Sequence, residues 1–204
     1  MKNEEIYRDL FIKNTIRLVA EGGFEKATTR AIVGDGKSGS IDRVNEAYIY
    51  RVFGTKENLF AETFAVLDDE LIWAIYDGFA FFDHDGDFRE QCEQLYLRLW
   101  RFLLQNEEKL RYYTRYYHSA YFKNDIYERH KKKYDPLVER IAPVFKPRAD
   151  VWALLHHVIS VLLSFAVSVC GRGLEDSEEN RTHIFIVAYS SISPYIKSDP
   201  QFIS

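Results

Sequence analysis

The sequence predicts an all-α fold, with a small N-terminal helical domain followed by a larger helical bundle. Apolar residues recur at helical spacing along most of the 204 residues, and no segment alternates with period two for long enough to form a strand. The chain has only five Pro and ten Gly, which favours long uninterrupted helices. Aromatic residues make up 16% of the chain, which indicates a large core, a ligand cavity, or both.

Residues 1–53 predict three helices. Apolar residues at helical spacing define the first, and the Gly pair that begins at Gly22 ends it. Thr28 caps a short second helix, and the Gly-rich stretch 34–40 separates it from the third. These helices are expected at about 3–21, 28–33 and 44–53.

Residues 54–204 predict a bundle of longer helices. Thr55 is a good N-cap for the fourth helix, which keeps an apolar stripe far along its length. Asp87 and Glu90 are spaced like a capping box at the start of the fifth, and Pro194 marks the end of the last. The helices are expected at about 55–82, 87–105, 107–121, 124–142, 148–172 and 178–196.

The charge is unevenly distributed, although the formal net charge of −4 excludes a polycation. Residues 1–60 carry ten Lys and Arg against nine Asp and Glu, whereas residues 61–204 carry 17 against 22. The N-terminal segment therefore permits contact with nucleic acid. Cys92 and Cys170 form no motif, and the start MKNEEIYRDL is too polar for a signal peptide, so we expect a cytoplasmic protein.

One stretch, 151–169, is apolar and about as long as a membrane span. The adjacent His156 and His157, and three Ser spaced four residues apart, argue against lipid on all sides. We predict a buried helix in a subunit interface and no membrane association.

Three candidate sites are excluded: a phosphate loop and a calcium loop by their residue spacing, and a histidine metal site by helix geometry. The stretch GDGKSGS at 34–40 matches the end of a phosphate loop, but the required first Gly falls on Ala31 and no strand precedes it. The stretch DHDGD at 83–87 puts Gly and Glu at the wrong places for a calcium loop. Adjacent His156 and His157 point about 100° apart on a helix and cannot share a metal. No catalytic signature is present either, so we expect no metal, no cofactor and no enzyme activity.

The aromatic cluster YYTRYYHSAYF at 112–122 puts tyrosines on two helix faces. Core packing explains most of them, and one face could line a pocket. Aromatic residues are therefore the candidates for a ligand pocket, and their chemistry predicts a small, flat, apolar or aromatic ligand. The candidates are Trp73, Tyr76, Trp100, Tyr112, Tyr116, Phe122 and Trp152.

The N-terminal residues contain a recognisable combination of short motifs. A Gly-aromatic pair, a Thr-Thr helix start, a Tyr-x-x-Phe and a Thr-Lys-Glu-x-Leu follow one another at Gly23-Phe24, Thr28-Thr29, Tyr50–Phe53 and Thr55–Leu59. In these motifs the sequence resembles the tetracycline-repressor-like (TetR) family of transcriptional regulators. The resemblance covers about residues 8–64 and rests beyond them only on length and helical character.

The resemblance implies a one-component transcriptional regulator that binds operator DNA as a homodimer. The third helix would enter the major groove, and Thr28 or Thr29 on one side and Lys56 on the other would grip phosphates. Asn45 and Tyr48 would face the DNA and Tyr50 would reach its backbone. The implied DNA-binding residues are Thr28, Thr29, Arg43, Asn45, Tyr48, Tyr50, Arg51 and Lys56.

The resemblance also implies how a ligand would act. The last two helices, about 148–172 and 178–196, would pair with those of a second subunit in a four-helix interface. A ligand among helices four to eight would change the separation of the two recognition helices, which must match half-sites roughly 34–36 Å apart.

One departure from the family supports an alternative. From Thr29 to Tyr50 is 21 steps, where the family usually has about 16, and the extra residues fall in the Gly-rich turn at 34–40. A tight turn fixes the angle between the two helices of this motif. The alternative is an α-helical small-molecule-binding protein of the same fold that has lost specific DNA binding.

Overall fold

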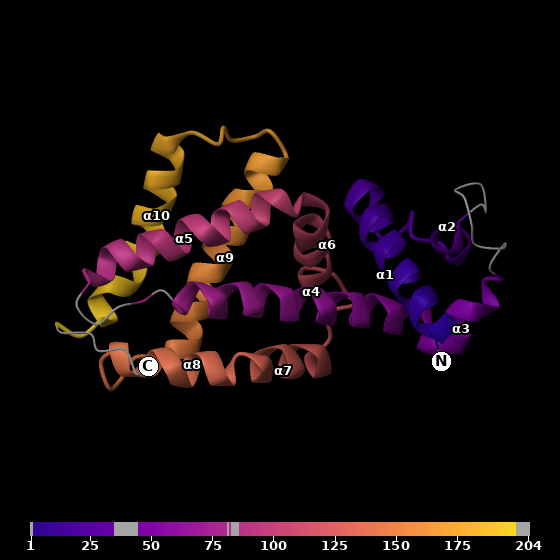
Figure 1. Ribbon diagram of the computed structural model, residues 1–204, viewed down its shortest axis with the longest axis horizontal. Helices are drawn as coiled ribbons and strands as arrows, with labels where there is room; N and C mark the ends of the chain where they lie inside the picture. Colours follow the sequence, from indigo (N-terminus) through magenta and orange to yellow (C-terminus); the bar gives the residue numbers. More distant parts are fainter. Residues whose placement is uncertain (1, 35–44, 81, 83–85, 199–204) are drawn as a thin grey trace. The chain divides into compact units, whose positions relative to one another are not determined.

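The computed structural model describes residues 2–34, 45–80, 82 and 86–198, and over these residues the chain is all α, as predicted (Figure 1). The chain divides into two compact units. The N-terminal unit comprises Met1–Asp69 and Glu108–Glu128, and the C-terminal unit comprises Glu70–Glu107 and Arg129–Ser204. The divisions between them therefore lie within three helices, Lys56–Phe79, Glu107–Tyr117 and Asn124–Lys133. Residues 35–40 of the Gly-rich turn lie outside the described residues.

Capping side chains and glycines set the helix ends of the N-terminal unit. Thr28 Oγ1 accepts a hydrogen bond from the Ala31 N–H at 3.2 Å, and Thr55 Oγ1 accepts one from the Asn58 N–H at 3.0 Å. Gly54 ends a helix with φ of 75°, which a residue with a side chain rarely adopts. The helices are α1 (Lys2–Gly22), α2 (Thr29–Val33), α3 (Ala47–Phe53), the first part of α4 (Lys56–Phe79), α6 (Glu107–Tyr117) and the start of α7 (Asn124–Lys133).

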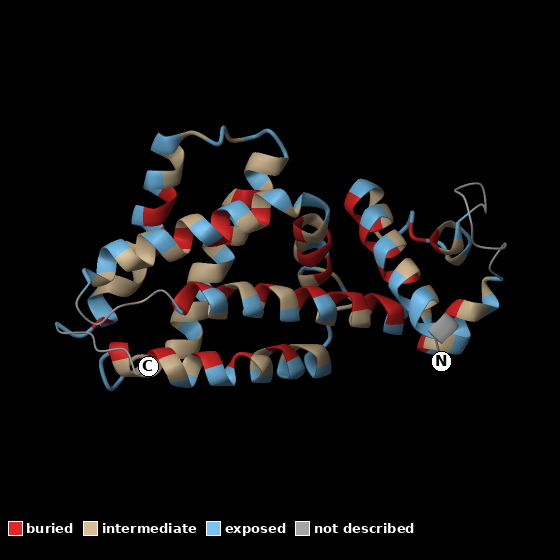
Figure 2. Cartoon of the chain, viewed as in Figure 1, coloured by how far each residue is buried: buried red, intermediate tan, exposed pale blue. Residues whose placement is uncertain are grey.

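The core of the N-terminal unit forms around α1, which packs against both α2 and α3. Buried residues, red in Figure 2, recur along α1 and α4 and include Phe11, Val19 and Leu59. Ile32 of α2 and Ile49 of α3 are fully buried, so each short helix has an apolar anchor. Because a helix of five or seven residues is unstable alone, this packing is what holds α2 and α3 in place.

The C-terminal unit is a bundle in which α9 packs against α5, α8 and α10. Two of its helices begin at aspartate caps: Asp87 accepts from the Glu90 N–H at 2.9 Å, and Asp150 accepts from the Ala153 N–H at 3.0 Å. The elements are α5 (Phe88–Gln105), α8 (Asp135–Ile141), η1 (Ala142–Val144), α9 (Val151–Cys170), α10 (Glu178–Ile192) and η2 (Ser193–Tyr195).

Several predicted helices were too long; those expected at 148–172 and 178–196 are α9 (Val151–Cys170) and α10 (Glu178–Ile192). The helix expected at 124–142 is two helices, α7 and α8, divided at Tyr134. Pro136 lies in the first turn of α8, where it needs no N–H donor, whereas inside one long helix its ring would clash with the preceding turn. The helix expected at 55–82 ends at Phe79, and the helix expected at 107–121 ends at Tyr117.

An isolated antiparallel bridge joins Phe145, after η1, to Ile196, after η2. The Lys146 N–H donates to the Tyr195 carbonyl at 2.8 Å, and the Lys197 N–H donates to the Val144 carbonyl at 3.0 Å. This 145–196 bridge fastens the segment after α10 to the segment before α9.

Candidate nucleic-acid interface and ligand cavity

The short helix α3 presents one side to the core and the other to solvent. Ile49 and Phe53 are buried. Ala47 is exposed, and the Tyr50 side chain is 53% exposed. Helix geometry explains this. Ile49 and Phe53 are one turn apart and define the buried face, and Tyr50 is rotated by about 100° from Ile49, which places it at the side of the helix.

Tyr48 is half-buried and packs inside the N-terminal unit. Its ring meets the ring of Tyr7 in α1 edge to face, with centroids 4.9 Å apart. The guanidinium of Arg51 lies over the same Tyr48 ring, 5.3 Å from its centroid. Tyr48 therefore connects α1 to the exposed side of α3.

The side chains at the start of α2 and α3 bond to one another. Thr29 Oγ1 donates a hydrogen bond to the Glu46 carboxylate, which joins the first turn of α2 to the residue before α3. Asn45 Oδ1 accepts from the Ala47 N–H at 2.9 Å, and Asn14 Nδ2 donates to the Ile32 carbonyl at 2.7 Å. These bonds tie α2 and α3 to each other and to α1 across the long connection between them.

The remaining candidates for DNA contact lie at the start of α4 or are not described. Lys56 is half-buried, and its ammonium lies 5.6 Å from the centroid of the Phe60 ring. Arg43 lies outside the described residues. The structure therefore brings Thr28, Thr29, Asn45, Tyr48, Tyr50, Arg51 and Lys56 into one unit, at the ends of α2, α3 and α4.

The structure does not bring the seven aromatic ligand candidates together. Tyr112, Tyr116 and Phe122 belong to the core of the N-terminal unit, where the Tyr112 hydroxyl donates to the Phe60 carbonyl at 2.8 Å. Rings of Phe24 and Tyr121 close the same cluster. Core packing accounts for all three candidates, because rings of this size fill the space between α4 and α6.

The four candidates in the C-terminal unit lie apart, each in its own surroundings. Trp73 is 71% exposed, and the guanidinium of Arg140 covers the Tyr76 ring at 5.8 Å. Trp100 is buried, donates from Nε1 to Asp176 Oδ1 at 2.9 Å, and lines an open groove of about 600 Å³ beside α5 and the start of α10. Trp152 packs against His130, Tyr134 and His156.

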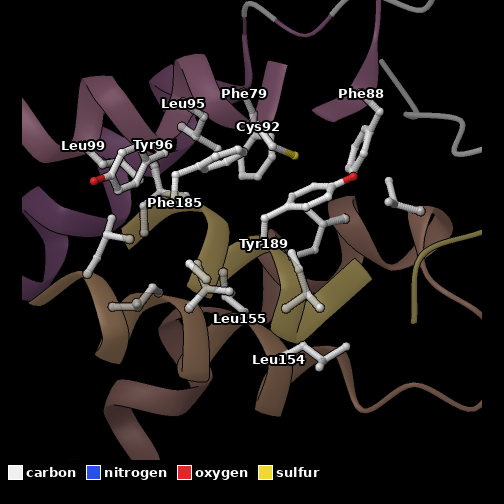
Figure 3. A pocket seen from close by; sticks show the side chains of 18 of the residues that line it. Phe79, Phe88, Cys92, Leu95, Tyr96, Leu99, Leu154, Leu155, Phe185 and Tyr189 are labelled. Carbon is white, nitrogen blue, oxygen red and sulfur yellow. The ribbon is translucent and has the colours of Figure 1, made fainter. Parts of the chain in front are cut away.

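An apolar cavity of about 120 Å³ lies instead among the helices of the C-terminal unit (Figure 3). In Figure 3, Tyr96 and Leu99 are at one end and Phe88 and Tyr189 at the other. None of the seven aromatic candidates lines it. The lining residues are Ile75, Phe79, Phe88, Cys92, Leu95, Tyr96, Leu99, Ile141, Val144, Phe145, Leu154, Leu155, Val158, Ile159, Leu162, Phe185, Ala188, Tyr189 and Ile192.

The cavity wall is uncharged at neutral pH. Burial raises the pKa of the Cys92 thiol from 9.0 to about 12, with a smaller contribution from Asp87. Burial likewise raises the pKa of Tyr96 and of Tyr189 above the ordinary value of 10.0. The lining includes no Asp, Glu, Lys, Arg or His, so the cavity favours a neutral ligand.

An apolar surface remains outside the cavity on the last two helices. In the single chain only Leu162 and Ala166 of α9 are buried, although the mean hydropathy of an 18-residue window of this helix is 2.0. On α10, Ile186 is 41% and Val187 is 51% exposed. These two helices also pack against each other, so they present a shared apolar surface.

Comparison with solved structures gives close likeness in fold across nearly the full chain. A TetR family transcription regulator from Marinobacter aquaeolei VT8 matches with a TM-score of 0.71 and 23% identity, over 93% of this chain and 97% of that one. A protein from Shewanella sp. PV-4, provisionally described as a TetR family transcription regulator, matches with a TM-score of 0.70 and 16% identity, over 91% and 97%. The chain has the TetR fold.

The TetR fold thus extends well beyond the N-terminal motifs that resemble the family in sequence. A TetR-like transcriptional regulator from Rhodococcus sp. RHA1 matches 92% of this chain and 96% of its own at a TM-score of 0.64 and 14% identity. Comparisons with protein-family models and with curated proteins each found no match.

Two further tests bear on this TetR-fold chain. Over the described residues, no group of three or more His, Cys, Asp and Glu is arranged to hold a metal ion. One helix in the described part, α9, is long and apolar enough to span a membrane by length and composition. Its packing against α5, α8 and α10 gives it the position of a bundle helix.

Proposed function

We propose that the chain is a one-component transcriptional regulator that binds operator DNA as a homodimer, with a small-molecule effector controlling its DNA affinity. The observation that carries the proposal is the placement of α3 in a chain with the TetR fold. Its apolar side is anchored by Ile49 and Phe53, and Tyr50 and Arg51 face solvent. A helix held in this way on two others can enter a major groove.

The contacts to phosphate follow from the hydrogen bonds already made. Thr28 Oγ1 accepts from the Ala31 N–H, so its own hydroxyl proton remains available to a phosphate oxygen. Thr29 donates its proton to Glu46, which makes it the weaker phosphate ligand. Lys56 supplies a positive charge at the start of α4, and Tyr50 an exposed hydroxyl at the side of α3.

We expect the homodimer to form through the apolar surface of α9 and α10. Exposed Ile186 and Val187 would be buried against the same helices of a second subunit, in a two-fold four-helix interface. That interface would also cover the half-buried sides of α9 and remove its apolar residues from water. We expect the dimer to act in the cytoplasm, where the free Cys92 and Cys170 would stay reduced.

The effector is proposed to bind in the cavity of the C-terminal unit. A dry cavity of roughly 150 Å³ lined by Leu, Ile and Phe can hold benzene, and the cavity here is about 120 Å³. The effector we propose is therefore a neutral compound no larger than a single ring, or a short alkyl chain. A carboxylate would lose its hydration with no partner in the wall.

The DNA-binding proposal is tested by a mobility shift with a duplex from the protein's own promoter region and a random duplex of equal length. Both affinities should fall steeply with salt, since bound phosphates release counterions. The promoter duplex should bind more tightly at every salt concentration, because base contacts do not depend on counterions. Equal affinity for the two duplexes throughout would exclude specific regulation.

The effector proposal is tested by thermal unfolding with toluene and with benzoate. Toluene at about a hundred times its Kd should raise the Tm by roughly 5–10 °C, and benzoate should leave it unchanged. Ala188→Leu fills the cavity and should abolish the response, whereas Ala153→Leu on the exposed side of α9 should preserve it. A response to benzoate equal to that with toluene would contradict the proposal.

The alternative is a ligand-binding protein of this fold without specific DNA binding. The observations that favour it are the five extra residues between Thr29 and Tyr50 and the carboxylate of Glu46 next to α3, which would repel phosphate. A response to toluene together with equal affinity for promoter and random duplexes would identify this alternative. An enzyme is less favoured, because the solved structures of this fold reported above are described as transcription regulators.

A further inference from the structure

One side chain occupies the outermost position of α3. Arg51 lies two residues from Ile49 and two residues from Phe53, so at about 100° per residue it points away from both. Both of those residues are buried and Arg51 is exposed, which agrees with the geometry. Tyr50 lies to one side of this outward direction and Tyr48 to the other. Ala47, one turn before Arg51, is exposed and small, so it leaves room for close approach.

The position of the Arg51 guanidinium is restricted by the aromatic ring on which it packs. It stacks over the Tyr48 ring at 5.3 Å, and that ring is itself held edge to face by Tyr7 of α1 at 4.9 Å. Stacking on an aromatic ring leaves the outer edge of a guanidinium free to donate hydrogen bonds. An arginine held in this way loses less conformational entropy on binding than a free one.

We propose that Arg51 reads a guanine in each half-site, donating to O6 and N7 in the major groove, and that Tyr48 is its positioning residue. The proposal rests on the DNA binding proposed above, and it names the residue that recognises a base in that complex. The paired donors of a guanidinium match the two acceptors that only guanine offers side by side in the major groove. The Tyr48 ring packs between Tyr7 and the Arg51 guanidinium. Tyr48 therefore positions the arginine and does not itself contact a base.

The experiment is selection from a duplex library randomised over roughly two helical turns, with the full-length chain and its variants, followed by measurement of affinity for the selected site. The wild type should enrich a symmetric site with a guanine in each half. Changing that base pair should weaken binding roughly tenfold or more. Arg51→Ala should remove the preference at that position and leave the others unchanged. Arg101→Ala, which removes an exposed arginine from α5, is the matched control and should leave the selected site unaltered.

The role of Tyr48 is tested by two substitutions. Tyr48→Ala should lose the guanine preference as Arg51→Ala does, whereas Tyr48→Phe keeps the ring and should keep the preference. A merely structural role would lower affinity for every base alike and would not change the ratio between bases. Circular dichroism of each variant separates loss of the ratio from loss of folding.

The outcomes separate this inference from the proposal on which it rests. Absence of any enriched site with the wild type would overturn the proposed regulation. An enriched site that Arg51→Ala leaves unchanged, or a uniform loss of affinity for all sites in that variant, would overturn the role of Arg51 alone. Loss of preference in Tyr48→Phe would overturn the positioning role of the Tyr48 ring.

Discussion

Three buried tyrosines of α6 satisfy their hydroxyl groups inside the N-terminal unit. The Tyr112 hydroxyl donates to the Phe60 carbonyl at 2.8 Å, Tyr113 donates to Asp68 Oδ1 at 3.0 Å, and Tyr116 donates to the Tyr121 carbonyl at 3.3 Å. A buried hydroxyl without a partner costs free energy, so these bonds select one arrangement of the rings. Their contribution is therefore to the specificity of packing as well as to its stability.

Removing the hydroxyl of Tyr112 should destabilise the chain. Tyr112→Phe leaves the Phe60 carbonyl without that donor in a fully buried position, so the free energy of unfolding should fall by about 1–3 kcal/mol. Urea unfolding measures the change. The control is Tyr50→Phe, which loses an exposed hydroxyl and should change stability by less than about 0.5 kcal/mol. Equal effects of the two substitutions would contradict the argument.

The sequence alone predicted which helices carry many of the candidate residues, but it did not predict which side chains surround them. The Tyr-x-x-Phe and Thr-Lys-Glu-x-Leu motifs fixed α3 and the start of α4 because caps and apolar anchors act locally. The ligand candidates failed because large rings were taken as signs of a cavity. Rings such as Trp100 and Tyr112 fill space, whereas the cavity is lined mainly by Leu, Ile and Val positions whose facing partners depend on tertiary packing.

At the scale of elements, the bond between Thr29 and Glu46 compensates for the length of the turn between α2 and α3. A short connection would fix the angle of the two helices directly. Here the residues before α3 are held instead by a charged hydrogen bond to the first turn of α2, and Ile49 supplies the apolar anchor against α1. A lengthened connection is therefore compatible with an ordered α3.

Breaking that bond should loosen α3 without unfolding the unit. Glu46→Gln keeps the shape of the side chain but removes the charge, and should increase amide hydrogen exchange in α3 roughly tenfold, because charged hydrogen bonds are stronger than neutral ones. Exchange in α1 should be unaffected. Glu25→Gln, an exposed carboxylate before α2, is the matched control. Unchanged exchange in α3 would show that Ile49 and Phe53 hold the helix without help.

The ends of a helix could be predicted from the sequence where a capping or helix-breaking residue marks them. The caps at Thr55 and Asp87 predicted the starts of α4 and α5. The division of α7 from α8 was missed, although Pro136 signals it, because the apolar spacing continues through the break. The 145–196 bridge joins residues about fifty positions apart, and no local pattern reports such a contact.

For the whole molecule, the buried titratable groups predict a stability maximum near neutral pH. Burial lowers the pKa of His156 below 6.5, with smaller effects of His130 and His157, so folding favours the neutral ring. That contribution is present above pH 6.5 and is lost as the pH falls towards the lowered pKa. Burial raises the pKa of Cys92 and of a set of tyrosines, so their contribution is present below about pH 9–10 and lost as the pH rises. The tyrosines are Tyr96, Tyr112, Tyr117 and Tyr189.

Unfolding by urea across the pH range checks both limits. The free energy of unfolding should be flat between about pH 7 and 9 and fall on either side. His156→Gln should reduce the fall in the free energy of unfolding below pH 7 and leave the fall above pH 9 unchanged. An acid limb identical in wild type and variant would assign that limb to other groups.

The oligomeric state is the second property of the whole molecule that can be tested. Val187→Glu puts a charge on the exposed apolar surface of α10, and by light scattering it should give a monomer of 24.1 kDa where the wild type gives the proposed dimer. The variant should stay folded, because Val187 is 51% exposed in the single chain. Val66→Glu on exposed α4 is the control and should remain dimeric. An unchanged mass for Val187→Glu would count against an interface on α9 and α10.

The 145–196 bridge sets a boundary for shortening or tagging the C-terminal end. Val144, which lines the cavity, accepts a main-chain bond from Lys197, and Lys146, next to the cavity-lining Phe145, donates one to Tyr195. Deleting residues from 195 onwards would remove both bonds and would release this part of the cavity wall. A fusion partner attached after Ser198 would leave both bonds intact.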